Sequence, residues 1–251
     1  MTTPSPSPHS SSSNRLKDGL VLKERVVPLK LKDFKLIAFD MDSTLINIEC
    51  IDEIASVVGL KKEVAHITEL TMKGDIKDFK ESLKQRVALL KGTPESALQE
   101  VYENSLKLNP GAQRLLSVCK ASGLQSLLVS GGFTYFAERV KALLEIDFSR
   151  SNELEVQGGL LTGELTPQTW GVICDGDEKK RMLIETSQQL GISLSQAIAV
   201  GDGSNDIPMM LACSQAGGLS VAYHAKPIVR EKALMSIESG GLDRMLEIFE
   251  F

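Results

Sequence analysis

Residues 36–44 read LIAFDMDST, and this short stretch sets the architecture of the chain. It opens with four apolar residues and then reaches an acid, a pattern typical of a buried parallel strand. Two later runs behave alike: LQSLLVS (124–130) leads into two glycines, and AIAV (197–200) leads into GDGSND. We therefore predict three parallel strands that each end in polar residues or glycines.

The segments between these strands have helical character. Residues 50–106 are broken at Gly59, Gly74 and 92–94, which predicts four short helices. Further on we expect helices at 133–144 and 178–190, a hairpin at 152–167 and a fourth strand, GLSVAY, at 218–223. Strands alternating with helices indicate an α/β fold, a Rossmann-like parallel sheet covered on both faces. The first helical block is too long for a simple crossover, so we predict a core at 34–47 and 110–251 with an inserted helical cap domain at 48–109.

The N-terminal end has a different composition. Residues 2–13 are Ser, Thr, Pro and one His, too polar to offset the entropy lost on ordering. We expect residues 1–33 to be a disordered Ser/Pro-rich tail and a linker, in which residues 20–32 could form a strand or a short arm. The segment also lacks the apolar core of a signal peptide.

Composition excludes several classes of protein. The 251 residues carry 28 Lys and Arg against 33 Asp and Glu, a net charge of −5, which does not suit a nucleic-acid partner. No apolar run approaches the roughly 18 to 20 residues of a membrane span. The four cysteines are scattered without a CxxC pair, which argues against a zinc site or disulfides and suits the reducing cytoplasm.

The three strand ends should converge on one site, because ligands of open α/β sheets bind at the carboxyl ends of the strands. Each cluster alone could be an ordinary turn or a helix cap; three in one chain favour a site. Several carboxylates without His or Cys point to Mg²⁺. Gly131 and Gly132 let backbone N–H groups approach a ligand, and with the Ser130 hydroxyl and an ammonium they would cradle an anion. These parts describe phosphoryl transfer through an aspartyl-phosphate.

DMDST, VSGG, a downstream lysine and VGDGSND resemble the four motifs of the haloacid dehalogenase (HAD) superfamily of phosphohydrolases. DMDSTLINIECIDEIA, FKESLKQRVALLKG, LLVSGGF, LLTGEL, VGDGSNDIPMM and AYHAKP extend the resemblance to the phosphoserine phosphatase family. It covers residues 36–251. It implies Mg²⁺-dependent hydrolysis of the small molecule O-phosphoserine to serine and phosphate, the last step of L-serine biosynthesis.

The resemblance also implies roles for individual residues. Asp40 would be the nucleophile, and Asp42 would protonate the leaving serine oxygen and then activate water. Mg²⁺ would bind the Asp40 carboxylate, the Asp42 backbone carbonyl and the Asp202 carboxylate, with Asp206 holding the metal's waters.

Other residues would bind the substrate. By resemblance, the phosphate would be held by Ser130, Gly131 and Lys179, and Asn205 would orient phosphate or substrate. The neighbouring Lys180 is the alternative lysine, although spacing to Asp202 favours Lys179. Glu49 would meet the substrate ammonium and Arg86 its carboxylate.

Residue patterns support the last two assignments unequally. Phe79, Leu83, Val87 and Leu90 form one apolar stripe, and Arg86 falls about 20° from Phe79 at about 100° per residue. A buried Arg needs a carboxylate partner, from a ligand or from the protein itself. Glu49 could merely favour a helix dipole.

Two other functions compete with hydrolysis. A phosphotransferase would pass the same phosphoryl group to a small alcohol such as homoserine. A phospho-aspartate signalling module would use a similar Asp cluster, but would be much shorter and would lack the helical insertion. The sequence gives no oligomeric state.

Overall fold

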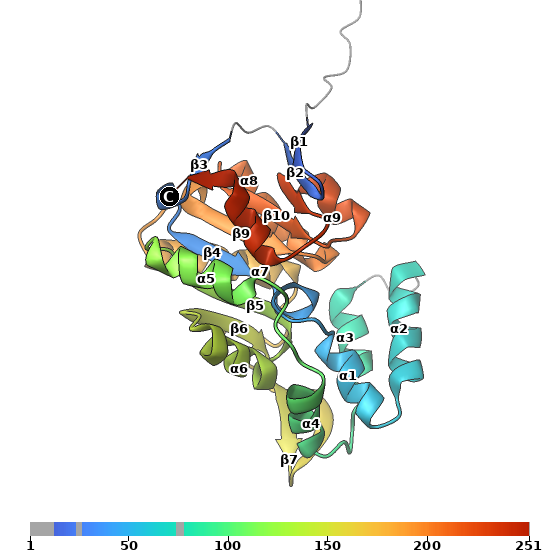
Figure 1. The fold of residues 1–251 in the computed structure, drawn as a ribbon. Coiled ribbons are helices and arrows are strands. Elements are labelled where there is room, and N and C mark those ends of the chain that lie inside the picture. The colour runs from blue at the N-terminus through green and yellow to red at the C-terminus, as the bar shows by residue number, and fades with distance from the viewer. Residues whose placement is uncertain (1–12, 24–26, 74–77, 251) are drawn as a thin grey trace, which may run out of the picture.

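The computed structural model describes residues 13–23, 27–73 and 78–250, with no side-chain description for 13–17, 72 and 73. A central sheet runs through the body of the molecule (Figure 1). Its strands in spatial order are β1 (Ser13–Lys17), β2 (Leu20–Lys23), β11 (Met235–Ile237), β10 (Leu219–Tyr223), β9 (Ala197–Gly201), β4 (Leu36–Phe39), β5 (Gln125–Phe133) and β6 (Phe148–Asn152). The strands from β11 to β6 pair in parallel. The α/β parallel-sheet fold is thereby confirmed.

Strand β4 lies at the centre of this parallel part. Ala38 pairs with Leu127 of β5 on one side and with Ala199 of β9 on the other. All four residues of β4 are buried, which explains the continuous apolar run that replaces the usual alternation of polar and apolar residues. The three strands that carry polar clusters are therefore neighbours.

Helices cover both faces of the sheet. Ile37 and Phe39 contribute to the core under α5 (Ala112–Ala121), α6 (Thr134–Leu144) and the short helix η5 (Leu242–Ile248). Leu36 and Ala38 point the other way, into the core under α7 (Gly176–Gln189), α8 (Ile207–Gln215) and α9 (Pro227–Lys232). This alternation is the two-residue period of a strand, and each buried aliphatic side chain contributes roughly 1.5–3 kcal/mol of transfer free energy.

Between β4 and β5 the chain forms α1 (Cys50–Val57), α2 (Lys61–Lys73), α3 (Phe79–Leu89) and α4 (Ser96–Asn104). Figure 1 shows α1, α2 and α3 grouped beside the main body. Gly59 and Gly92 take left-handed φ values of 77° and 82° at two of the predicted breaks, a conformation that glycine adopts without a Cβ clash. Gly74 lies outside the described residues.

A hairpin extends from the core toward this helical group. Its strands, β7 (Leu154–Gln157) and β8 (Leu160–Leu165), occupy the predicted 152–167 region. The backbone N–H groups of Gly92 and Leu161 donate to Leu161 O and Thr93 O, both at 2.8 Å. The hairpin is thus joined by main-chain hydrogen bonds to the turn between α3 and α4.

The N-terminal region differs from the prediction. Residues 1–12 of the expected disordered tail lie outside the described part, and 13–17 form a strand that was not expected. The strand at 20–23 falls within the stretch for which a strand or a short arm was the alternative. Leu20 and Leu22 are buried, and β2 pairs antiparallel with β11. Further along, β3 (Leu29–Lys30) pairs with β12 (Phe249–Glu250), and the short helix η1 (Leu31–Asp33) follows. These elements are too short to give a local signal; β2 and β3 pair with strands more than 200 residues away.

Two further findings concern membrane-spanning helices and the cysteines. None of the helices in the described residues combines the length and apolar character needed to traverse a bilayer. The cysteines Cys50, Cys119, Cys174 and Cys213 are buried free thiols.

Candidate active site

A cavity of about 500 Å³ opens where β4, β5 and β9 end, between the sheet and the helices α1–α3. Its walls contain most of the residues singled out in the sequence: Asp40, Asp42, Glu49, Arg86, Ser130, Gly131, Asp202 and Asn205. The convergence expected from the three strand ends is therefore present. The proposed substrate contacts Glu49 and Arg86 belong to the helical side of the same cavity.

The loop after β4 presents two of the acids. Asp40 accepts a hydrogen bond from Met41 N at 2.6 Å, which begins the tight turn η2 (Met41–Leu45). Within this turn Ser43 has φ 57°, a left-handed conformation that is uncommon for a residue with a side chain and often marks a functional loop. The turn places Asp40 and Asp42 on the cavity wall.

Lys179 lies in the first turn of α7 and connects the loops after β4 and β9 by binding Asp40 and Asp206. Its side chain is fully buried, and Nζ lies 2.8 Å from Asp40 Oδ1 and 2.6 Å from Asp206 Oδ1. Burial alone would lower the pKa of this ammonium, but the carboxylates of Asp206 and Asp40 raise it above its ordinary value, so Lys179 is a fixed positive charge. Lys180 is exposed, which leaves Lys179 as the lysine that contacts the site.

Asp206 is bound on both of its oxygens. Besides the contact from Lys179, its Oδ2 accepts from the backbone N–H groups of Asp202 at 3.1 Å and Gly203 at 2.9 Å. Asp206 therefore fixes the loop after β9 and the position of Asp202. Thr44 completes this arrangement, since its hydroxyl donates to Asp202 Oδ1 at 2.9 Å.

Negative charge exceeds positive charge at the floor of the cavity. Oxygen atoms of Asp40, Asp202 and Asp206 lie within 4.8 Å of one another, with the ammonium of Lys179 between Asp40 and Asp206. Burial, then Asp206, raises the pKa of Asp202 to about 7; burial and Asp206 also raise the pKa of Asp40 well above its ordinary value. Carboxylates in this state favour a cation, and their hard oxygens suit Mg²⁺.

Asp42 lies in a different environment from Asp40. Its two oxygens accept from the Cys50 backbone N–H at 3.2 Å and from the Cys50 thiol at 3.1 Å. Burial, followed by the charge of Glu49, raises its pKa to about 7, although the bonds from Cys50 oppose the shift. A carboxyl group with this pKa exchanges a proton readily near neutral pH, as a general acid and base must.

The end of β5 forms a narrow wall opposite these acids. Gly132 N donates to Ser130 Oγ at 2.9 Å, and Asn152 Nδ2 donates to Gly131 O at 2.7 Å. A Cβ on Gly132 would lie 3.0 Å from Asp42 Oδ2 and 3.1 Å from Ser130 Oγ. The absence of side chains at 131 and 132 thus keeps space for a group that approaches the backbone.

The helical side of the cavity carries one cationic and one anionic side chain, those of Arg86 and Glu49. Among the described residues, the Arg86 guanidinium has one hydrogen-bond acceptor, Ser82 O (Nε···O 3.3 Å). Burial lowers the pKa of Arg86, while Asp52 and then Glu49 oppose this shift. Glu49 accepts from the Ser43 hydroxyl at 2.6 Å. Arg86 is half-buried and lines the cavity.

Three contributors were not predicted from the sequence. Thr44 and Cys50 hold Asp202 and Asp42, and Asp52 lines the cavity with an Oδ1 that is buried without a hydrogen-bond partner among the described residues. Asp52 follows Glu49 by three residues, the spacing that puts two side chains on one helical face. That spacing was the available signal for Asp52.

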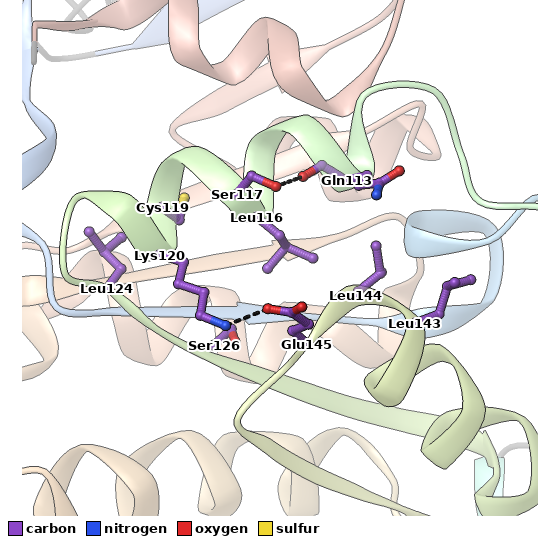
Figure 2. Close-up of a pocket in the computed structure, with 10 residues that line it drawn as sticks. All are labelled: Gln113, Leu116, Ser117, Cys119, Lys120, Leu124, Ser126, Leu143, Leu144 and Glu145. Atoms are coloured by element: carbon purple, nitrogen blue, oxygen red, sulfur yellow. Dashed lines mark hydrogen bonds and ion pairs between the residues drawn. The ribbon is translucent and has the colours of Figure 1, made fainter.

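Figure 2 shows a separate pocket of about 120 Å³ between α5 and the end of α6. Leu116, Leu124 and Leu144 contribute to its lining, and Lys120 and Glu145 form an ion pair of 2.5 Å beside them. None of its lining residues is shared with the larger cavity. It is therefore a distinct feature from the acidic site.

Comparisons with known proteins agree with this geometry. The profile of the haloacid dehalogenase-like hydrolase family matches residues 37–211. A phosphoserine phosphatase of a Polaromonas species is 61% identical over 233 residues, which cover 93% of this chain and 97% of the relative. The phosphoserine phosphatase of Haemophilus influenzae is 42% identical and aligns with 86% of this chain and 66% of its own length.

Solved structures of phosphoserine phosphatases are also similar to this chain in fold. A phospho-aspartyl intermediate analogue of phosphoserine phosphatase superposes with a TM-score of 0.77 at 37% identity, covering 86% of this chain and 99% of the other. A substrate-bound phosphoserine phosphatase complex gives the same TM-score, identity and coverage.

Proposed function

The chain belongs to the haloacid dehalogenase-like hydrolases, and within them to the phosphoserine phosphatase family, and on this basis we propose that it hydrolyses O-phosphoserine through an aspartyl-phosphate. The observation that carries the proposal is a single cavity lined by Asp40 and Asp42 from the core and by Arg86 and Glu49 from the helical segment. The first pair suits phosphoryl transfer. The second pair suits the charges of an amino acid.

Asp40 is the nucleophile in this proposal. Its carboxylate oxygen attacks phosphorus, the P–O bond to the serine side chain breaks, and the phosphoryl group is left on Asp40. Lys179, held against Asp40 at 2.8 Å, stays protonated and offsets negative charge on the carboxylate and on the incoming phosphate. Ser130 and the backbone at Gly131 would hold the remaining phosphate oxygens, and Asn205, which lines the same cavity, would orient phosphate or substrate.

Asp42 acts twice. In its protonated form it gives a proton to the leaving serine oxygen, so that neutral serine hydroxyl departs. As a carboxylate it then takes a proton from water, which attacks phosphorus, releases inorganic phosphate and restores Asp40. Its pKa of about 7 supports both directions of transfer, and the separate environments of Asp40 and Asp42 divide the two roles.

The cavity floor fits a divalent cation. Asp40 and Asp202 would hold Mg²⁺ with their carboxylates and Asp42 with its backbone carbonyl, while Asp206 fixes the Asp202 loop. A bound Mg²⁺ would supply positive charge beside the transferring phosphoryl group. The excess of carboxylates over Lys179 at this point is the structural support for the metal.

Residues of the helical segment would give the enzyme its preference for an amino-acid phosphate. Arg86 can form a bidentate pair with the substrate carboxylate, which a planar guanidinium does better than an ammonium. Glu49 would pair with the substrate ammonium. We propose that residues 48–109 act as a cap that excludes water while the phosphoryl group is transferred, and that the reaction completes L-serine biosynthesis in the cytoplasm.

A phosphate-release screen tests the proposal. Purified protein with Mg²⁺ is offered phosphoserine, phosphothreonine, small sugar phosphates and an aryl phosphate, with and without homoserine as acceptor. We expect phosphoserine to give the highest kcat/KM, with one serine formed per phosphate released. Transfer of the phosphoryl group to homoserine, or a higher kcat/KM for another natural phosphomonoester, would refute the assignment.

A further inference from the structure

The chain leaves the core after η2 and returns to it at residues 106–109, and these two crossings lie side by side. Ile46 and Leu108 form an antiparallel bridge. Asn47 N donates to Lys107 O at 3.0 Å, and Lys107 N donates to the Asn47 side chain at 2.7 Å. The two chain crossings between the core and the helical segment therefore form a short two-stranded ribbon.

One residue of the returning strand, Asn109, reaches beyond this ribbon into the catalytic loop. Its side-chain Nδ2 donates to three backbone carbonyl oxygens, at 3.3 Å for Ser43, 2.8 Å for Thr44 and 3.0 Å for Ile46. Its backbone N–H donates to the fourth, Leu45 O, at 2.8 Å. All four carbonyls of residues 43–46 thus accept hydrogen bonds from a single residue.

The chemistry of this contact requires a hydrogen-bond donor. Carbonyl oxygens only accept hydrogen bonds, so the group that faces three of them must be a donor. A carboxylate of the same shape would repel them, and an apolar side chain would leave them without their partner. The cost of such an unpartnered buried polar group exceeds the value of an ordinary surface hydrogen bond.

The bonded loop is the one whose shape matters most for the reaction. Ser43 has the left-handed φ of 57°, and its carbonyl is among those that Asn109 holds. Strained residues of this kind persist where surrounding contacts fix them. Asp42 directly precedes this residue, so a change in the turn moves the Asp42 backbone and side chain together.

We propose that Asn109 is a positioning residue that holds the catalytic loop and thereby sets the place of Asp42. The inference rests on the proposed function, because Asp42 is the proton donor and acceptor in that scheme. Asn109 acts through the loop and does not line the cavity wall. Since Asp42 serves any phosphomonoester, loss of Asn109 should affect kcat irrespective of the leaving group.

The experiment compares Asn109→Leu, Asn109→Asp and Asn109→Thr with wild type, using both phosphoserine and an aryl phosphate. Leu keeps the approximate size and removes the donors, Asp replaces the donor with an acceptor, and Thr retains one hydroxyl donor. We expect kcat to fall about 10- to 100-fold for Leu and further for Asp, because small misplacements of a catalytic group cost about this much. Thr should lie between Leu and wild type, and KM should change less than about threefold.

Asn47→Ala is the matched control, since it removes a hydrogen bond from the same ribbon without touching residues 43–46. Its kcat should stay within about twofold of wild type. An equal fall in kcat for Asn47→Ala would assign the effect to ribbon stability and overturn the proposal. A folded Asn109→Leu protein with wild-type kcat would also overturn the proposal. If Asn109→Leu does not fold, wild-type kcat in the milder Asn109→Thr variant would overturn it instead. If the wild-type protein hydrolyses the aryl phosphate but not phosphoserine, phosphoserine is refuted as the substrate. The kcat values of the Asn109 variants and wild type can then still be compared on the aryl phosphate.

Discussion

The Lys80 ammonium of α3 lies 3.0 Å from the carboxylate of Asp175, and this ion pair joins the helical segment to the catalytic core. Asp175 caps α7 by accepting from Glu178 N at 2.9 Å, and the same first turn carries Lys179. At the preceding position of α3, the Phe79 ring lies so close to β5 that a Cβ on Gly131 would meet it at 3.1 Å. The start of α3 therefore contacts both walls that would surround a bound phosphate.

Replacing Lys80 by Met should loosen this contact. The pair is partly exposed, and such pairs contribute about 0.2–1 kcal/mol, so we expect KM for phosphoserine to rise about twofold to fivefold with kcat little changed. Salt screens exposed charges, so the difference from wild type should shrink at high ionic strength. Lys84→Met, an exposed change on the same helix, is the control. Equal KM values for wild type and Lys80→Met at low salt would contradict a role of this pair in holding the cap.

Replacing Asp40 by Asn should abolish turnover in a folded protein. An amide nitrogen does not attack phosphorus under these conditions, and the amide is a poorer ligand for Mg²⁺. Asp42→Asn should keep its backbone carbonyl as a ligand and lose about 10² to 10⁴ in rate through loss of the acid and base. Phosphate release and circular dichroism measure the two properties. Substantial phosphate release by folded Asp40→Asn would refute the nucleophile assignment.

The metal-free protein should lose stability as the pH rises. Carboxyl groups of the unfolded chain titrate near pH 4, whereas burial raises the pKa of Asp42 and Asp202 to about 7. The folded state therefore holds protons that the unfolded state has lost, and this stabilisation, complete below about pH 4, disappears as the pH rises through 7. We expect Tm in excess chelator to fall between pH 5 and pH 7.5.

Two additions isolate the acidic cluster in that experiment. Asp202→Asn should flatten the dependence of Tm on pH, because an amide does not titrate. Mg²⁺ should raise Tm most at pH 7.5, where the carboxylates are ionised, and should restore phosphatase activity. A metal-free Tm that rises over this interval, or full activity in chelator, would contradict the proposed cation site.

Much of this molecule was predictable because its central strands are buried on both faces. The runs at β4, β5 and β9 are continuously apolar, so their type and the position of their polar ends follow from the sequence. Strand β6 gave no such signal: it is an edge strand with the sequence FSRSN, and its polar side chains bind neighbours, as Arg150 binds Glu178 and Glu185. Edge strands with paired polar residues resemble loops when read locally.

The residues of the candidate site also divide into those that the sequence predicts and those that it does not. Asp40, Asp202 and Lys179 lie at strand or helix ends where spacing and resemblance point to them, and the structure brings them into contact. Asn109 was missed because its partners are remote, whereas Asp52 was missed although its spacing from Glu49 offered a local signal. Asn109 bonds to carbonyls 63 to 66 positions earlier in the chain, and a pattern of residue types carries no information about which backbone carbonyls a distant amide will meet.

Replacing Arg86 by Ala should separate phosphoserine from other phosphomonoesters. The guanidinium lines the same cavity as Asp40 and has one protein acceptor, Ser82 O, among the described residues, so its remaining donors can pair with a substrate carboxylate. Removing one partner of a buried charge pair typically costs about 2 to 5 kcal/mol, and we expect kcat/KM for phosphoserine to fall accordingly. An aryl phosphate has no carboxylate and should lose far less. Arg86→Lys should recover part of the loss, since it keeps the charge but not the planar fork. The measured quantity is the ratio of kcat/KM for the two substrates. An equal fall for both would make Arg86 a structural residue of α3 and remove the main support for phosphoserine as the substrate.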